Sequence, residues 1–364
     1  MTAEERIFRG SPHYYERVEG VRFGQADLDF LSLNLPPTCN YRCKFCFAGM
    51  GQNRLPEFAD TLSIEEIQSL IDTARELGVR HLEISGEGEP FMYPGKILAI
   101  LRHATEQGIH TTLFTNGALL NEALLTELAS HDVSIAFSVD MPDKEGYEQF
   151  VGRKNSYERI IENLAIARDM FRQRIQRVDG RTVFPLAIHT IINDQNRGQI
   201  QEIRALTQDE IFFSLAPMIH RGDAQINPGL GEAQQEDADI ISRDSDGSVI
   251  VSDTSVATMG RPLCATFQYG VGLRHNGEGL FDAHCFESAG QIGNIRDLPL
   301  QKIVARVRAL QQRYFETHDD GGFCPLRNPN FDRFLNTLQI GIPNLKIKFW
   351  ELRTSTCKEF IQTP

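Results

Sequence analysis

The sequence predicts an α/β fold, a partial (βα)6 TIM-type barrel followed by a small α+β domain. Between residues 28 and 217, short apolar segments with the period of a strand alternate with longer segments with the period of a helix. Strands and helices that alternate at this spacing indicate βα units and a parallel sheet. About six units make an open barrel, in which functional side chains follow the C-terminal ends of the strands. Beyond residue 258 a hairpin pattern replaces this alternation.

The chain before the first strand shows no sustained period. Residues 1–27 mix charged and aromatic types, and we expect a surface lead-in there. The first strand, at residues 28–35, alternates apolar side chains and ends at Pro36 and Pro37, which cannot donate to a sheet. A loop therefore leaves the C-terminal end of this strand.

The first predicted helix, at residues 63–77, has signals at both ends. Ser63 and Glu66 match a capping box, one face is apolar, and Gly78 can end the helix. The same alternation then predicts strands at 79–85, 109–115, 132–139, 183–192 and 211–216, and helices at 95–107, 121–130, 157–174 and 198–207.

Composition favours a globular enzyme. The 364 residues are 41% hydrophobic, which suffices for one large or two ordinary domains with a packed core. No apolar run approaches the ~18 residues of a membrane span, and the N-terminus lacks a signal-peptide pattern, so we expect a cytoplasmic protein without membrane contact. The net charge of −12 disfavours nucleic-acid binding, which depends on Lys and Arg, and weakly favours a cationic substrate.

Three cysteines follow the first strand at the spacing C-x3-C-x2-C. Cys39, Cys43 and Cys46 can each reach one iron of a cubane cluster, which leaves the fourth iron open for another ligand. A zinc site and three unrelated thiols are the alternatives. Zinc usually takes four ligands with Cys in C-x2-C pairs, and no fourth Cys or His lies in this loop. The spacing therefore favours an iron–sulfur cluster.

A glycine-rich turn follows the second predicted strand. Its residues are Gly86, Glu87, Gly88, Glu89 and Pro90. Glycine lets the backbone approach a ligand closely, and the two glutamates present carboxylates. Alone, such a sequence is equally consistent with a plain structural turn. One strand beyond the three cysteines, it indicates a ligand site.

The cysteine loop and this turn resemble those of the radical S-adenosylmethionine (SAM) superfamily, whose loop usually has an aromatic residue at the position of Phe45. The resemblance implies a 4Fe–4S cluster on Cys39, Cys43 and Cys46, with SAM on the open iron. In that family, one-electron reduction cleaves SAM to methionine and a 5′-deoxyadenosyl radical, which removes hydrogen from an unactivated carbon. The glycine-rich turn is then implied to hold the amino group of SAM.

Family members place further SAM contacts after the third and fourth strands. By resemblance, Asn116 lies near the cofactor or substrate, and Ser138 and Asp140 bind the ribose. Arg153 matches a position that often pairs with the SAM carboxylate, which suits a planar guanidinium. Each of these could also be an ordinary surface or capping residue. Weaker candidates are His189 and Asn193, on the fifth strand and its turn.

The C-terminal third predicts a change of architecture. Residues 222–258 are acidic, polar and short of aromatic side chains, so we expect a linker that forms a mobile loop or lid between the barrel at 28–221 and a second domain. Residues 259–364 are expected to form that domain, with a hairpin at 269–284 and a helix at 299–313.

Four cysteines in this second domain are candidate ligands of another cluster. Cys264 and Cys285 flank the hairpin, an arrangement that resembles the twitch or SPASM extension of radical SAM enzymes, where such residues bind an auxiliary 4Fe–4S cluster. By the same resemblance Cys324 and Cys357 are further ligands, although the seven cysteines of a full SPASM pattern are not present. Alternatively, these are buried or surface thiols, or Cys324 or Cys357 donates hydrogen to a substrate radical.

The resemblance implies a radical SAM oxidoreductase, whereas substrate identity does not follow from a fold. We expect oxidation of a small polar natural product such as an aminocyclitol or sugar, with a flavodoxin- or ferredoxin-type electron donor. The alternative is a maturase that crosslinks, oxidises or epimerises a peptide, but only 38 residues precede Cys39, too few for the leader-binding domain that such enzymes often carry. A non-catalytic metal-binding regulator is a further alternative.

Overall fold

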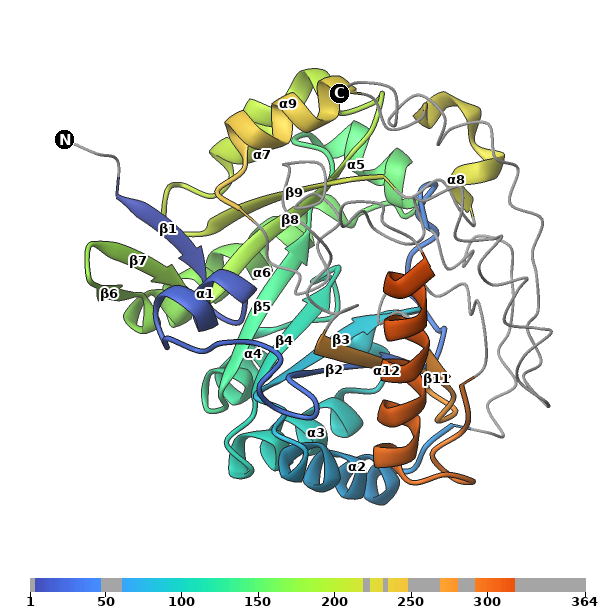
Figure 1. The fold of residues 1–364 in the computed structure, drawn as a ribbon. Coiled ribbons are helices and arrows are strands. Elements are labelled where there is room, and N and C mark those ends of the chain that lie inside the picture. Colours follow the sequence, from blue (N-terminus) through green and yellow to red (C-terminus); the bar gives the residue numbers. More distant parts are fainter. Residues whose placement is uncertain are drawn as a thin grey trace.

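The computed structural model describes residues 4–46, 61–218, 223–231, 235–247, 269–280 and 292–317. Its main feature is a run of six parallel strands that are neighbours in the order of the sequence (Figure 1). These strands are β2 (Phe30–Leu35), β3 (His81–Gly86), β4 (His110–Thr115), β5 (Val133–Ser138), β8 (Leu186–Ile192) and β9 (Phe212–Pro217). The structure confirms the partial (βα)6 barrel and brings the C-terminal ends of six strands to one edge.

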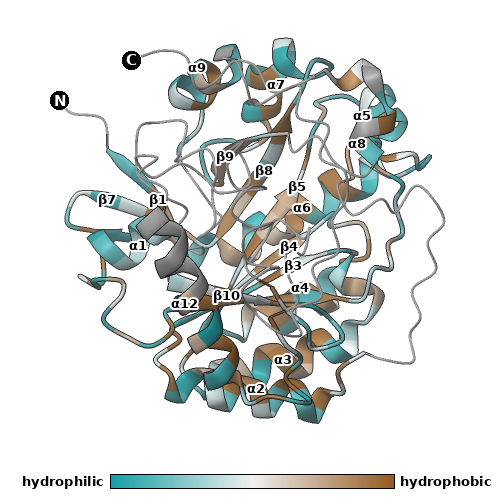
Figure 2. Ribbon diagram, turned by 45° about the vertical axis from the view of Figure 1, so that its right-hand side comes forward, coloured by the Kyte–Doolittle hydropathy of each residue, from teal (hydrophilic) through white to brown (hydrophobic). Residues whose placement is uncertain are grey.

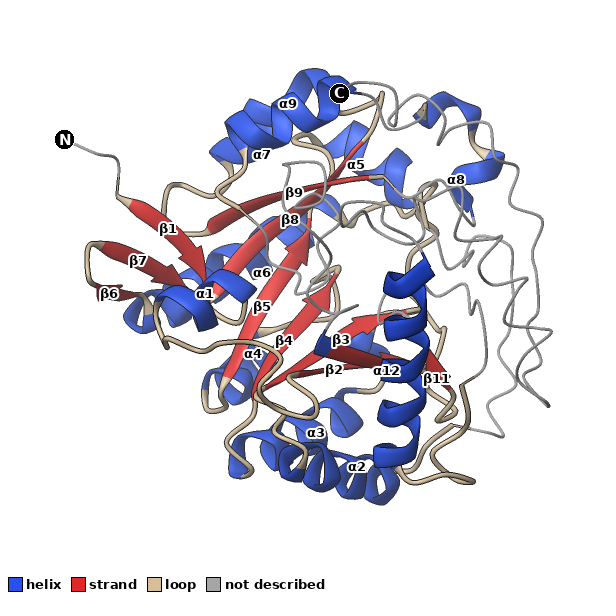
Figure 3. Ribbon diagram, in the orientation of Figure 1, coloured by secondary structure: helices blue, strands red, loops and turns tan. Residues whose placement is uncertain are grey.

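Helices lie around the strands, which occupy the middle of the molecule (Figure 3). The helices of the barrel are α2 (Ile64–Glu76), α3 (Pro94–Glu106), α4 (Glu122–Ala129), α5 (Lys144–Val151), α6 (Tyr157–Phe171) and α7 (Ile200–Ala205). The predicted capping box is present, because the Ser63 hydroxyl accepts from the Glu66 N–H and the Glu66 carboxylate accepts from the Ser63 N–H. Of the helices described, none is both long enough and apolar enough to cross a membrane.

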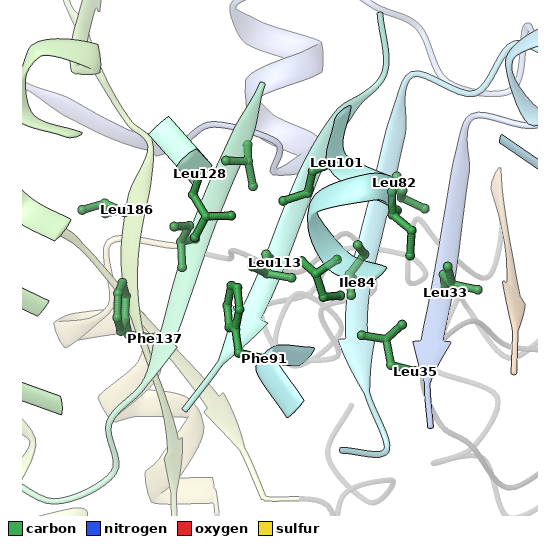
Figure 4. Packing of buried hydrophobic residues seen from close by; sticks show 14 of the residues in the cluster. Leu33, Leu35, Leu82, Ile84, Phe91, Leu101, Leu113, Leu128, Phe137 and Leu186 are labelled. Atoms are coloured by element: carbon green, nitrogen blue, oxygen red, sulfur yellow. The ribbon is translucent and has the colours of Figure 1, made fainter. Parts of the chain in front are cut away.

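Each strand turns alternate side chains toward the helices, and these side chains form the main core. Leu33, Leu35, Ile84, Leu113 and Phe137 are at most 2% exposed and belong to one hydrophobic cluster with helical side chains (Figure 4). The surrounding helices carry both hydrophobic and hydrophilic residues, as expected of segments with one buried face (Figure 2). The remaining strand residues face the inside of the barrel.

The expectation of a surface lead-in at residues 1–27 is wrong. This segment contains β1 (Glu5–Phe8), which pairs in parallel with β7 (Arg181–Phe184), and α1 (Pro12–Arg17). Tyr15 of α1 is 2% exposed, and its hydroxyl lies 3.0 Å from Nδ1 of His81, the first residue of β3. The segment therefore covers the N-terminal end of the barrel. Both elements are too short to show a period, and the partner strand is distant along the chain.

The single strand predicted at 183–192 is two strands, which is a second correction. Pro185 separates β7 from β8, because proline has no N–H to continue a ladder. β7 belongs instead to a separate sheet in which it also pairs, antiparallel, with β6 (Gln176–Val178).

The acidic segment at 222–258 contains helices where we expected a mobile loop, so that expectation is wrong for its described part. The helices are α8 (Asp223–Ile226) and α9 (Gln235–Asp244). Ile240 and Ile241 of α9 are buried, and Asp237 forms a 2.7 Å ion pair with Arg197. Two buried apolar residues and one ion pair hold α9 against the barrel. The acidic composition of the segment gave no indication of this burial.

The predicted hairpin is present in its described part, residues 269–280, whereas residues 281–284 lie outside the described residues. Its strands are β10 (Gly270–Leu273) and β11 (Gly279–Leu280), and the predicted helix after it is α12 (Leu300–Thr317). β10 also pairs in parallel with β2, so it extends the barrel sheet, although it lies in the segment expected to form a separate domain.

Candidate active site

The three cysteines lie on the loop that leaves the C-terminal end of β2. Cys39, Cys43 and Cys46 are free thiols and each is partly buried. The Tyr41 N–H donates to Cys39 Sγ at 3.4 Å, and the Cys46 N–H donates to the Cys43 carbonyl at 3.1 Å. The three thiols are within electrostatic range of one another. They therefore belong to one site.

Helix α5 holds the middle of this loop. The Arg42 N–H donates to the Val151 carbonyl at 2.9 Å, and the Lys44 N–H donates to the Phe150 carbonyl at 3.1 Å. The Phe45 ring stacks on Phe150, with 4.8 Å between ring centroids and 19° between planes. These bonds use carbonyls at the C-terminus of a helix, which have no partner within the helix.

The short helix α8 holds the end of the loop. The Asp223 N–H donates to the Cys46 carbonyl at 2.8 Å, and the Asn227 side-chain amide donates to the Lys44 carbonyl at 3.0 Å. The sequence did not predict this contact, because an acidic segment has no pattern that identifies its partner.

The chemistry of the thiols fits a cluster. Burial raises the pKa of Cys39 to about 12 and the pKa of Cys43 well above its usual range. Such thiols stay protonated unless a metal binds them, since coordination deprotonates a thiol. Among the described residues, no three His, Cys, Asp or Glu side chains gather around a single metal-ion position. Ligands of a cubane bind different irons, so the three thiols fit a cluster better than a zinc ion.

The glycine-rich turn after β3 packs directly against the cysteine loop. The Glu89 N–H donates to the Thr38 carbonyl at 2.8 Å. A Cβ at Gly88 would lie 2.4 Å from the Thr38 carbonyl oxygen and 2.6 Å from that of Pro36. Glycine is required here because the backbones of the two loops touch.

Glu89 is the central acidic group of this turn and is 3% exposed. Its carboxylate accepts hydrogen bonds from the Thr115 hydroxyl at 2.7 Å, the Asn116 N–H at 2.8 Å and the Phe91 N–H at 3.1 Å. Burial raises the pKa of Glu89 to about 7, against these hydrogen bonds. The three hydrogen bonds fix the side chain in place. At neutral pH its neutral and charged forms have similar populations.

Asn116 connects the third strand to the cysteine loop. Its side-chain amide donates to Asn40 Oδ1 at 2.8 Å and lies 3.9 Å from Cys39 Sγ. The structure therefore brings together Asn116, Glu89 and the cysteine loop, which the sequence predicted to share a site. Thr115 and Asn40 complete this network, and no sequence pattern predicted a role for either.

The two candidates after β5 have different surroundings. Asp140 is 2% exposed and accepts from the Ile191 N–H at 2.7 Å, and burial raises its pKa to about 7. Burial raises the pKa of the Cys43 thiol, and the charge of Asp140 contributes to the same change. Ser138, partly exposed, ends β5 and pairs in register with His189 of β8.

The three remaining candidate residues, Arg153, His189 and Asn193, differ in their exposure and in their contacts. Arg153 is exposed next to Gly152, where a Cβ would lie 2.9 Å from the Arg42 carbonyl oxygen, so it lies near the cysteine loop. His189 is buried, and burial lowers its pKa to about 4. Asn193 serves its own turn, because its side chain donates to Ile191 and accepts from Gln195.

One contact that sequence reasoning missed connects the glycine-rich turn to the hairpin. The Glu87 carboxylate, 9% exposed as a residue, pairs with the Arg274 guanidinium at 3.0 Å. His275 Nδ1 lies 3.8 Å from the same carboxylate. Burial raises the pKa of Glu87, and Arg274 opposes that change. Pairing of β10 with β2 creates this contact, which no local pattern could reveal.

The four cysteines proposed for a second cluster lie outside the described residues. They are Cys264, Cys285, Cys324 and Cys357. The auxiliary cluster and the hydrogen-donor role of Cys324 or Cys357 stay predictions.

Comparison with known proteins identifies the family of the barrel segment. Residues 33–202 match the profile of the Radical SAM superfamily. The chain is 30% identical over 199 residues to a GTP 3′,8-cyclase of Peptoclostridium acidaminophilum, covering 52% of this chain and 56% of the relative. It is 32% identical over 132 residues to the dTDP-4-amino-4,6-dideoxy-D-glucose ammonia-lyase of Streptomyces venezuelae, covering 35% of this chain and 26% of the relative.

A solved structure has the same fold. The structure of anSMEcpe with bound AdoMet superposes with a TM-score of 0.54 at 12% identity, covering 78% of this chain and 83% of that one. At this identity the likeness concerns the fold alone.

The fold and the family match define residues 33–202 as a radical SAM domain. A domain of this family implies a 4Fe–4S cluster and SAM as cofactors. The chain spans about half the length of the curated relatives that it matches first.

Proposed function

We propose that the chain is a radical SAM oxidoreductase that oxidises a small polar substrate with hydroxyl or amino groups. The observation that supports this most is the contact between the cysteine loop and the glycine-rich turn, through Gly88, Glu89 and Thr38. It places a buried carboxylate beside three thiols suited to a cluster. When bound, the cluster and SAM supply a 5′-deoxyadenosyl radical for hydrogen abstraction.

The proposal gives each side chain a physical role. Cys39, Cys43 and Cys46 hold the cluster, and Glu89 accepts the ammonium group of SAM. A cation next to Glu89 favours its carboxylate form, which burial alone disfavours. Asp140, which is buried and follows β5, accepts ribose hydroxyls in this proposal.

Three less buried residues, Arg153, Ser138 and Phe45, have roles at the edge of the site in this proposal. In the proposal Arg153 pairs with the SAM carboxylate, and Ser138 contributes a hydroxyl near the ribose. Phe45 packs the loop onto α5 by stacking on Phe150. Fixed groups of this kind hold reactants in position, which is a large part of enzymatic rate enhancement.

The net charge of the chain and the name of one relative both support an amine-bearing substrate. The net charge of −12 favours a cationic substrate at long range. One relative is named for an amino sugar, dTDP-4-amino-4,6-dideoxy-D-glucose, which supports a small amine-bearing substrate. A flavodoxin- or ferredoxin-type protein is the proposed electron donor, and the C-terminal cysteines are proposed ligands of an auxiliary cluster.

The test compares wild type with a variant that combines Cys39→Ala, Cys43→Ala and Cys46→Ala, after anaerobic reconstitution. We expect about four fewer irons per chain, loss of the matching electron paramagnetic resonance signal, and no 5′-deoxyadenosine from SAM. Gly95→Ala, on α3 with nothing within 4 Å of the added Cβ, is the control and keeps all three readouts. Continued 5′-deoxyadenosine production by the triple variant would overturn the proposal.

The reaction type has its own test. An oxidation releases one 5′-deoxyadenosine for each product molecule and adds no solvent hydrogen to the product. Mass spectrometry of the product formed in heavy water measures this. If one carbon of the product gains a deuterium, the reaction is an epimerisation and the proposed oxidation is wrong.

A further inference from the structure

The inside of the barrel is polar along β2 and β3, whereas Ala136, Ala187 and Phe212 on β5, β8 and β9 belong to a second hydrophobic cluster. On β2 the leucines Leu31, Leu33 and Leu35 belong to the core cluster. Because side chains alternate along a strand, Ser32 and Asn34 point the other way, into the barrel.

Strand register places further polar residues in the layer of Ser32. Ser32 pairs with Glu83 of β3, Glu83 pairs with Thr112 of β4, and Thr112 pairs with Ser134 of β5. Asn34 pairs with Ser85, which directly precedes the glycine-rich turn. Asn34 therefore lies at the cofactor end of the barrel, and the Ser32 layer lies about 7 Å deeper along the strands.

The next layer of side chains, toward the N-terminal ends of the strands, closes the barrel at that end. Phe30, His81 and His110 pair in register, and the Tyr15 hydroxyl reaches His81. A Cβ at Gly10 would lie 2.7 Å from the Thr112 hydroxyl oxygen, so the N-terminal segment fills the space beneath this layer.

Several polar atoms of the inner wall are buried without a described hydrogen-bond partner. They are Ser32 Oγ, Thr112 Oγ1, and both Oδ1 and Nδ2 of Asn34. The three residues are 1%, 0% and 0% exposed. Ser134 differs, because its hydroxyl lies 3.1 Å from His110 Nε2. Buried polar atoms in folded proteins nearly always have a partner, so a group of them along one wall marks a place where a ligand or water binds.

We propose that Ser32, Asn34 and Thr112 form the substrate-binding wall of the barrel and that they recognise a small molecule with several hydroxyl or amino groups. This inference rests on the proposed function, since it names the substrate class of the same site. Two hydroxyls and one carboxamide offer both donors and acceptors, which matches hydroxyl and amino groups. An apolar substrate would leave the same atoms unpaired, and a site of this kind rejects analogues that lack the matching groups.

Glu83 belongs to the same layer of the wall. It is 2% exposed and lies between Ser32 and Thr112 in the strand register.

The test measures binding to the reconstituted full chain with SAM present, by isothermal titration calorimetry. The probes are 2-deoxystreptamine, which has several hydroxyl and amino groups on one ring, and cyclohexylamine, which has a similar ring and no hydroxyl. We expect the first probe to bind and the second to bind at least about tenfold more weakly. Equal binding of the two probes, or binding of neither, would overturn the proposed substrate class.

Two matched variants locate the binding wall on β4. Thr112→Val and Thr111→Val remove equally buried hydroxyls from opposite faces of the strand, and Thr111 also lacks a described partner. We expect Thr112→Val to weaken 2-deoxystreptamine binding about tenfold and Thr111→Val to leave it unchanged. Asn34→Leu, similar in volume, is expected to weaken binding by at least as much, which gives a second variant if Thr112→Val does not fold.

The outcomes separate this inference from the proposed function. Equal effects of the Thr111 and Thr112 substitutions would place the ligand outside the barrel and overturn the inference. Production of 5′-deoxyadenosine by wild type is independent of the probe, so its absence contradicts the proposed function instead.

Discussion

At the residue scale, burial sets the protonation of the side chains around the site. Burial raises the pKa values of Glu89 and Asp140 to about 7, and it lowers the pKa of His189 to about 4. All three changes have the same cause, since a low-dielectric interior disfavours the charged form of any group. His189 is therefore a neutral hydrogen-bonding group at physiological pH, and its Nδ1 lies 3.3 Å from the Ser214 hydroxyl.

His189 predicts an acid-dependent loss of stability. Its pKa falls from 6.5 to about 4 on folding, so the unfolded chain binds more protons in this range. The contribution is complete above pH 6.5 and is lost as pH falls through about 4. We expect His189→Asn to remove about 2 kcal/mol of the stability difference between pH 7 and pH 5. Urea unfolding at both pH values measures it, and parallel profiles of wild type and variant would contradict it.

The sequence identified most of the residues now found together, because their chemistry is local. A C-x3-C-x2-C spacing and a glycine-rich turn are both readable in a few residues. The supporting groups are different: Thr115 and Asn40 are ordinary residue types, and only the approach of β4 to the cysteine loop gives them a role.

At the element scale, the cysteine loop is held between the turn after β3 and the C-terminus of α5. Backbone groups make most of these contacts, including the bonds from Arg42 and Lys44 to α5 and from Glu89 to Thr38. Backbone contacts tolerate many side chains but not added volume at the point of contact. The geometry of the loop therefore depends on the shape of its neighbours.

Gly88→Ala tests this dependence. The new Cβ would lie 2.4 Å from the Thr38 carbonyl oxygen and 2.6 Å from the Thr38 nitrogen, so backbone must move. We expect a loss of about 2 kcal/mol or more in stability and a cluster content less than half that of wild type.

The control for Gly88→Ala is Gly95→Ala in helix α3, where the added Cβ has nothing within 4 Å. It should stabilise the protein slightly, because alanine is a better helix former than glycine. Thermal unfolding and iron content are the measurements. Normal iron content in Gly88→Ala would show that the two backbones can separate without harm.

The predicted barrel helices agree with the structure to within three residues at their ends, because periodicity over ten or more residues and capping signals reveal amphipathic helices. Short elements were missed for the opposite reason. β1 and α1 have four and six residues, too few to show a period. The strand at 183–192 was predicted as one because its apolar pattern continues through Pro185, although the ladder does not.

At the scale of the whole molecule, distant segments complete the barrel at both ends. The N-terminal segment covers the base through Gly10 and Tyr15. β10 adds to the sheet beside β2 and brings Arg274 to the glycine-rich turn. The site is therefore built from the N-terminal, central and C-terminal parts of the chain.

The Glu87–Arg274 pair predicts coupling between the turn and the hairpin. Glu87→Gln or Arg274→Gln breaks this mostly buried ion pair, and we expect SAM affinity to fall about tenfold in each. Because both changes break the same contact, the double variant should bind SAM about as well as either single variant. Equilibrium binding of SAM to the reconstituted proteins measures this.

Glu278→Gln is the control for this cycle, since the Glu278 carboxylate lies 4.0 Å from the Arg274 guanidinium, farther than the 3.0 Å of Glu87. It should change SAM affinity less than twofold. Additive losses in the double variant would mean that Glu87 and Arg274 act independently.

The sequence by itself determined the six main strands of the barrel and most of its helices, the cluster-ligand spacing and the glycine-rich turn, because each depends on neighbours within a few residues. Only the tertiary structure decided that Glu89 is bonded to Thr115 and Asn116, that Glu87 meets Arg274, and that Ser32, Asn34 and Thr112 share one inner wall. These contacts join residues distant in sequence through strand pairing. Register between strands is set by the packing of the whole core, so no local pattern carries it.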